Sequence, residues 1–131
     1  MEYHLFISHS WKYDENYNAL YDYFKDRGYF SFKDFSIPSE APLDVKTKKE
    51  LYIALENKIR LCHVVLVVVR SVNYSEWIPK EIEIAKNFNK PIIAFVPRGI
   101  VNIPQIIKDN ADDIVYTYYE KLIESIRVNS I

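Results

Sequence analysis

One carboxylate stands out in the sequence because it falls on the apolar side of a predicted helix. The segment from about Glu76 to Phe88 has helical periodicity, with an apolar stripe roughly 160° wide when successive residues lie about 100° apart. The stripe consists of Trp77, Ile78, Ile82, Ile84, Ala85 and Phe88, and it includes Glu81. The other charged residues of the segment are on the opposite side: Glu76, Lys80, Glu83 and Lys86. A carboxylate on an apolar face therefore needs a specific reason, because burying it unpaired is costly.

Two explanations for Glu81 are open on the residues alone. In the structural one, Glu81 caps a backbone donor or pairs with a basic side chain at the edge of the core. In the functional one, it is the carboxylate of a site. Its position favours a site, because the positive end of the helix dipole stabilises negative charge near the helix N-terminus, where Pro79 is also tolerated.

The rest of the chain predicts a doubly wound α/β fold, with a parallel five-stranded sheet and helices on both faces. Short β-rich apolar runs alternate with segments of helical period, which is typical of this architecture. The predicted strands are 3–8, 29–35, 62–69, 91–96 and 112–116. The first predicted helix follows Asp14 and ends at Gly28, a left-handed stop, and the second follows Thr47, which begins a capping box. Two more predicted helices span about 76–88 and 117–127.

The loops that follow Ser8, Phe35 and Arg70 are expected at one edge of this sheet. Ligands of open α/β sheets bind in the crevice outside the carboxyl ends of the strands. Glu81 is expected to face this crevice, because its helix follows the central predicted strand, 62–69. The connection DFSIPSEAPLDVK, from Asp34 to Lys46, is long for this kind of fold, which is often a sign of function.

Composition limits the classes of function. The 131 residues fit one domain, 1–131, and 49% hydrophobic with 27% charged residues are typical of a folded globular protein. A formal charge of -1 provides no general attraction to nucleic acid or to an anionic membrane. The longest apolar run, Val64 to Val69, is too short to span a bilayer, and Cys62 is a lone cysteine. We expect a cytoplasmic protein without a disulfide, a metal site or a membrane segment.

Several nucleotide-binding and signalling folds are excluded by missing residues. With only Gly28 and Gly99, the chain has neither a dinucleotide-binding glycine motif nor a P-loop. A response-regulator receiver requires acidic residues after the first and third strands, where this chain has Ser8-His9-Ser10 and Arg70-Ser71. The sequence therefore predicts neither hydride transfer, nor nucleoside triphosphate hydrolysis, nor phosphoacceptor chemistry.

Four segments, in the right order and spacing, resemble the Toll/interleukin-1 receptor (TIR) domain family. LFISHS resembles the end of the first TIR strand, and GYFSFKDFSI resembles the second strand running into the BB loop. VVLVVVRSVNYSEWIPKEI is similar to the third strand and the helix with the W-x-x-x-E element, and KPIIAFV to the fourth strand. The resemblance implies a flavodoxin-like TIR fold and covers nearly the whole chain.

The resemblance also implies an activity. The glutamate of W-x-x-x-E is catalytic in TIR enzymes, which corresponds to Glu81, and NAD is the substrate rather than a cofactor. The enzymes separate nicotinamide from ADP-ribose by hydrolysis, cyclisation or transfer. The further substrate-binding candidates are Ser8, His9, Ser10, Trp11, Asp34 and Trp77. Trp11 and Asp34 are candidates by position alone, and the ordinary alternatives are core packing for Trp77 and capping for His9.

The size of the chain is similar to that of the TIR component of bacterial Thoeris antiphage systems. That likeness implies a product read by a separate effector, and we expect a homo-oligomer formed through TIR contacts. Two other functions stay open. One is an enzyme similar to nucleoside deoxyribosyltransferases, in which a glutamate attacks the sugar. The other is a non-enzymatic TIR adaptor that works by self-association.

Overall fold

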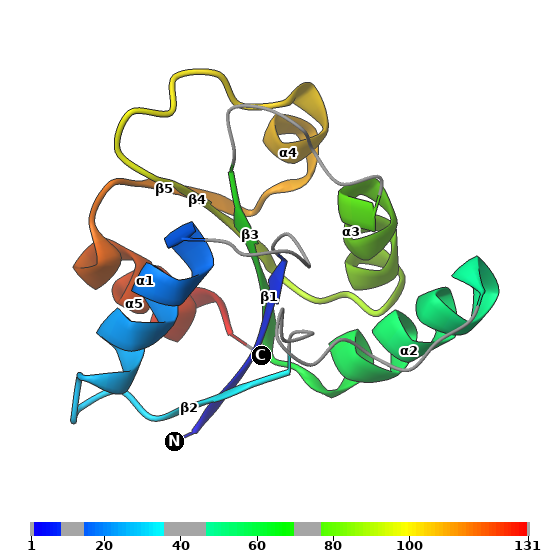
Figure 1. Ribbon diagram of the computed structural model, residues 1–131, viewed down its shortest axis with the longest axis horizontal. Coiled ribbons are helices and arrows are strands. Elements are labelled where there is room, and N and C mark those ends of the chain that lie inside the picture. The colour runs from blue at the N-terminus through cyan, green and yellow to red at the C-terminus, as the bar shows by residue number, and fades with distance from the viewer. Residues whose placement is uncertain (1, 9–14, 36–46, 70–76, 131) are drawn as a thin grey trace.

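Five strands form one parallel sheet in the order β2-β1-β3-β4-β5, and helices cover both of its faces (Figure 1). This computed structural model describes residues 2–8, 15–35, 47–69 and 77–130. The strands are β1 (Tyr3–Ser8), β2 (Phe32–Asp34), β3 (Val64–Val68), β4 (Ile92–Val96) and β5 (Asp113–Tyr116). The helices are α1 (Glu15–Lys25), α2 (Lys48–Leu61), α3 (Trp77–Asn87), α4 (Gln105–Asn110) and α5 (Tyr119–Asn129). The predicted fold class is confirmed.

The central strand, β3, lies between β1 and β4, and every one of its residues is buried. Its sequence, VVLVV, has no polar residue at alternate positions, because helices cover both sides of the sheet and neither face of the strand meets water. Branching at the β-carbon also favours the extended backbone. This strand matches the predicted run 62–69 except at its ends, where Cys62 caps α2 instead.

Different helices cover the two faces of the sheet. α2 and α3 pack with Phe6 of β1 in one apolar cluster, whereas α1 and α5 pack with Leu5 and Ile7 in a second cluster. Figure 1 shows α2 and α3 to the right of the sheet and α1 and α5 to its left. Because successive side chains of a strand point to opposite faces, Ser8 lies on the same face as Phe6. Ser8 and α3 therefore share one face of the sheet.

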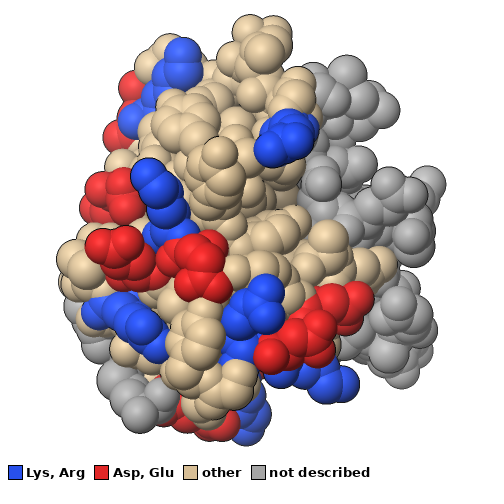
Figure 2. Space-filling model, turned by 90° about the vertical axis from the view of Figure 1, so that its left-hand side faces the viewer, with Lys and Arg blue, Asp and Glu red and all other residues tan. Residues whose placement is uncertain are grey.

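Acidic and basic side chains lie interspersed on the side where α1 and α5 are found (Figure 2). One polar cluster here connects the two helices. The Glu120 carboxylate accepts hydrogen bonds from the hydroxyls of Tyr23 and Tyr29, and Arg27 Nε lies 3.6 Å from Glu120 Oε1. These hydrogen bonds hold the pKa of Glu120 below its ordinary value. The cluster is exposed, so we assign it a role in orienting the helices and little energetic weight.

The ends of the helices follow local rules at some positions and depart from prediction at others. The predicted cap at Thr47 is present, since its hydroxyl accepts a hydrogen bond from the Glu50 amide at 3.1 Å. Gly28 does not have the predicted left-handed backbone, because within the described ranges positive φ occurs at Asn89, Gly99 and Thr117. The stop after α1 is instead an ordinary turn that needs no left-handed residue.

Three further elements differ from prediction. β2 is shorter than the predicted 29–35, because the Phe30 amide bonds to the Arg27 carbonyl in a turn before the strand begins. α5 begins at Tyr119 rather than near Thr117, whose positive φ of 66° is incompatible with the helix. α4 was not predicted, since six residues with one buried position show no clear period. None of the described helices is both long and apolar enough to span a membrane.

The central position of β3 leads to a test by core truncation. Leu66→Ala should lower the free energy of unfolding by about 2–5 kcal/mol, because Leu66 is fully buried in β3. Leu61→Ala removes the same atoms from a side chain that is 52% exposed at the end of α2, and should cost less than about 1 kcal/mol. Urea denaturation of the two variants measures the difference. Equal losses would contradict the packing described for β3.

Candidate functional site

Glu81 is the one acidic residue in the described ranges that is buried, with 2% of its surface exposed. It is the fifth residue of α3, where Ile78 and Ile82 on the same helix are also buried. Lys80 and Glu83 are more exposed, as the helical period predicts. The expected burial of Glu81 on the apolar side of its helix is therefore observed.

Ser8 is the polar residue that interacts with Glu81 from the sheet. It is the last residue of β1, is 1% exposed, and pairs in register with Val67 near the end of β3. The site is therefore at the carboxyl edge of the sheet, the edge where open α/β folds bind ligands.

Two buried polar atoms at this place have no partner among the described residues. Ser8 Oγ and Glu81 Oε2 form no hydrogen bond of normal geometry with any of the residues that the structure describes. Buried polar atoms in proteins are nearly always hydrogen-bonded, because an unsatisfied group costs about 1–3 kcal/mol. The pair thus offers a donor and an acceptor that a hydroxyl-bearing ligand would satisfy.

Burial also changes the protonation of the site. Removal from water disfavours the charged form of the carboxyl and raises the pKa of Glu81 to about 8. The nearby Ser8 hydroxyl acts in the opposite direction and lowers this pKa, although the two side chains do not reach normal hydrogen-bond geometry. The desolvation outweighs the hydroxyl, so the carboxyl is mostly protonated at neutral pH while nothing is bound.

The other predicted site residues fall into two groups. Trp77 is the first residue of α3, about one helical turn before Glu81, but its side chain lies outside the described part of the chain. His9, Ser10 and Trp11 directly follow Ser8 and also lie outside the described residues. Their roles in substrate binding stay predictions.

Asp34 is not brought next to Glu81. It pairs with Leu5, three residues before Ser8, so it lies about 10 Å back from the carboxyl end of β1 at about 3.3 Å per residue. Its carboxylate accepts a hydrogen bond from the hydroxyl of Tyr17 in α1, the helix on the opposite face of the sheet. This contact links β2 to α1.

Sequence reasoning did not single out the pairing of Ser8 with Glu81 or that of Tyr17 with Asp34. The first was available from strand alternation, because Ser8 has the same parity as Phe6, which faces α2 and α3. The pairing of Tyr17 with Asp34 depends on how α1 lies over the edge strand β2. No local pattern in the sequence indicates that arrangement.

Other reactive groups in the described residues form no competing site. The Cys62 thiol is buried and donates to the Ile59 carbonyl, and burial raises its pKa to about 11, which makes it a poor nucleophile. Three or more His, Cys, Asp or Glu side chains do not gather anywhere in the described ranges in a way that suits a metal ion.

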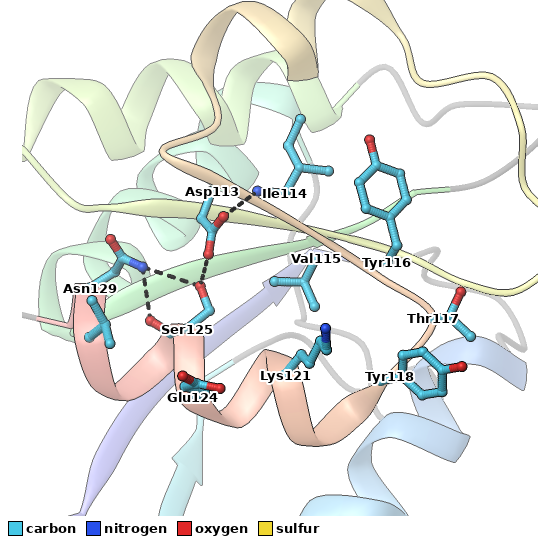
Figure 3. A pocket seen from close by; sticks show the side chains of 11 residues that line it. Asp113, Ile114, Val115, Tyr116, Thr117, Tyr118, Lys121, Glu124, Ser125 and Asn129 are labelled. Atoms are coloured by element: carbon cyan, nitrogen blue, oxygen red, sulfur yellow. Dashed lines mark hydrogen bonds between the residues drawn. The ribbon is translucent and has the colours of Figure 1, made fainter.

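A pocket of about 520 Å³ lies away from Glu81, along β5 and α5 (Figure 3). Three of its polar side chains, Asp113, Ser125 and Asn129, are linked by hydrogen bonds. Asp113 accepts a hydrogen bond from the Ser125 hydroxyl at 2.5 Å, and the Asn129 amide donates to the Ser125 carbonyl at 2.9 Å. These bonds brace α5 against the edge strand. None of the side chains that line this pocket has a buried polar atom without a hydrogen-bond partner, as Glu81 has, so we place the candidate chemistry at Glu81.

A protein-family model described as "Thoeris protein ThsB, TIR-like domain" matches residues 6–101. This range begins within β1, continues through β4 and includes Glu81. No curated protein sequence matches the chain significantly.

Solved structures share the fold at low sequence identity. A conserved protein from Enterococcus faecalis V583 has a TM-score of 0.72 and 14% identity, covering 98% of this chain and 99% of its own. A 2-deoxyribosyltransferase from Bacillus psychrosaccharolyticus has a TM-score of 0.60 and 13% identity, with coverages of 92% and 90%. The CMP N-glycosidase BcmB from Clostridium botulinum has a TM-score of 0.57 and 11% identity, with coverages of 95% and 98%.

The buried carboxyl predicts a dependence of stability on pH. A group whose pKa rises on folding binds more protons in the folded state, so the free energy of unfolding falls as pH rises from about 4.5 to about 8. Relative to Glu81→Gln, the wild type should lose at most roughly 5 kcal/mol over this range. Urea denaturation at pH 5, 6.5 and 8 measures the loss.

The matched control for this measurement is Glu83→Gln. Glu83 is exposed on the same helix, so this variant should keep the wild-type dependence on pH. If Glu81→Gln and the wild type showed the same dependence, the carboxyl would not be desolvated as described.

Proposed function

Because the chain belongs to the TIR-like domain family of Thoeris protein ThsB, we propose that it cleaves the bond between nicotinamide and ribose in NAD. Glu81 is the catalytic carboxylate in this proposal, and NAD is its substrate rather than a cofactor. The observation that carries the proposal is the buried Glu81 carboxyl, next to an equally buried Ser8 hydroxyl at the carboxyl edge of the sheet.

One carboxylate is enough for this reaction. The bond between C1′ of the ribose and the ring nitrogen of nicotinamide breaks, and its electron pair leaves with nicotinamide. The ring nitrogen is positively charged in NAD, so nicotinamide departs as a neutral molecule and needs no proton. Positive charge develops on the ribose, where ionised Glu81 stabilises it electrostatically. Water or another nucleophile then adds to C1′ and releases a proton.

The neighbours of Glu81 have separate proposed tasks. Ser8 orients a ribose hydroxyl, since its own hydroxyl is buried and without a partner in the described part of the chain. His9, Ser10 and Trp11 continue from Ser8 along the chain and contact ribose or phosphate, and Trp77 stacks on a ring of the substrate. Asp34 is left out of this set, because its carboxylate contacts Tyr17 over the other face.

The family also suggests the biological setting. The product is ADP-ribose, a cyclic form or a conjugate, and a separate effector reads it as a signal during antiphage defence in the cytoplasm. Assembly of several copies of the chain through TIR contacts supports the active state. These parts of the proposal follow from family membership and not from the geometry of the site.

A second candidate is an N-glycosidic enzyme that acts on nucleosides. The observation that favours it is the burial of Glu81, because a carboxyl whose pKa is raised to about 8 has a proton to donate to a neutral leaving base. An adaptor that works by self-association alone is the third alternative, and it assigns no task to the buried carboxyl.

The first test is incubation of the wild type, Glu81→Gln and Glu83→Gln with NAD, with nicotinamide and ADP-ribose species resolved by mass spectrometry. The wild type and Glu83→Gln should release nicotinamide, and Glu81→Gln should be slower by at least about 100-fold, because an amide cannot stabilise the developing charge as an anion does. Deoxynucleosides and CMP are assayed in parallel. Cleavage of these instead of NAD would favour the second candidate, and equal rates with NAD for all three proteins would refute the role of Glu81.

Ser8→Ala tests the proposed positioning residue. This variant should fold normally, because it removes a buried hydroxyl that lacks a partner among the described residues, but kcat/KM should fall about tenfold. The rise of the rate with pH should also move to higher pH, since Ser8 lowers the pKa of Glu81. Ser125→Ala, at a buried serine of the β5–α5 pocket, is the control and should leave both unchanged. An unchanged pH profile in Ser8→Ala would count against the assignment.

A further inference from the structure

Among the residues that the structure describes, no basic side chain pairs with Glu81 to keep its carboxyl charged. The buried residues of the cluster around α3 are apolar, and Ser8 is the one polar side chain of the described residues that affects the carboxyl. No cationic side chain of the described residues contributes to its titration.

The charged groups on the elements packed around Glu81 lie outside the core. On α3 they are Lys80, Glu83 and Lys86; on α2, Lys48, Lys49, Glu50, Glu56, Lys58 and Arg60; on α4, Lys108 and Asp109. All of these are exposed or half-buried, whereas Glu81 is 2% exposed. On β1 and β3 and next to them, the described titratable groups are Glu2, Tyr3, His4, Cys62 and His63, all at the amino ends of these strands and away from Ser8. None of these described groups is therefore a buried partner for the Glu81 carboxyl.

We propose that Glu81 is neutral while the site is empty, and that it loses its proton when a substrate with a positively charged ring at the glycosidic nitrogen binds. The site thereby selects cationic N-ribosides over neutral ones. This inference rests on the proposed function, because it takes the cleaved bond to lie next to Glu81. Its physical basis is that a cation within about 4–6 Å favours the ionised form of a carboxyl, most strongly where water is excluded.

The selection follows from the proton balance. Binding of a cationic riboside creates a buried ion pair and releases one proton to the solvent. A neutral riboside does not ionise Glu81 and meets a carboxylic acid without the charge needed to stabilise the ribosyl cation. Stabilisation of the ribosyl cation by ionised Glu81 is thus limited to a substrate whose leaving group departs without a proton.

The inference is tested with two ligands that the enzyme cannot cleave in this reaction. Carba-NAD, in which a methylene replaces the ring oxygen of the nicotinamide ribose, keeps the cationic ring, whereas NADH has a neutral ring. Calorimetric titration at pH 6.0, 6.75 and 7.5, in two buffers with different heats of ionisation, measures affinity and proton release together. The proteins are the wild type, Glu81→Gln and the surface control Glu83→Gln.

The wild type and Glu83→Gln should release about one proton per carba-NAD, and their affinity should rise about tenfold per pH unit. NADH should bind without proton release and with an affinity independent of pH. Glu81→Gln, which has no proton to lose, should show neither effect with carba-NAD.

Different results would overturn different parts of the account. Binding of carba-NAD to the wild type without proton release, equal release with NADH, or no binding of carba-NAD would reject the inference. In each case, release of nicotinamide from NAD by the wild type would still support the proposed function. Absence of that release at every pH from 6 to 9 would reject the proposed function itself.

Discussion

The burial of one carboxyl group, where α3 packs against the sheet, is the constraint on which the candidate site depends. Removal of Glu81 from water favours its neutral form and raises its pKa to about 8. The structure does not offset this with a basic partner or a complete set of hydrogen bonds among the described residues. A stable core would normally avoid such an arrangement. Its presence at the ligand-binding edge of the fold is the reason to connect it with chemistry.

The order of strands and helices places the Glu81 carboxyl at the carboxyl edge of the sheet. β3 is buried on both faces and fixes the middle of the sheet, and β1 pairs with it so that Ser8 reaches the carboxyl edge. The chain then returns as α3 over the face that Ser8 shares. Position on the sheet alone does not bring a carboxylate to this site. Asp34 lies on the neighbouring strand β2, but its side chain is on the opposite face and contacts Tyr17.

Much of this could be predicted from the sequence where the signals are local and periodic. The unbroken apolar run identified β3, the helical period placed Glu81 among buried residues, and Thr47 marked the start of α2. Short or tertiary features could not be predicted in this way. α4 has too few residues for a period, and the face that Asp34 occupies depends on the register of an edge strand of three residues. The pKa of Glu81 depends on complete burial, which a helical stripe suggests but does not measure.

The central claim is that Glu81 is a neutral acid in the empty site and an anion next to its substrate. Carbon-13 NMR of the glutamate carboxyl groups, with Glu81 assigned by its loss in Glu81→Gln, tests this directly. We expect a titration midpoint near pH 8 in the free protein and an ionised signal at pH 6.5 in the presence of carba-NAD. A midpoint near 4.5 in the free protein, or a signal that carba-NAD leaves protonated, would contradict it.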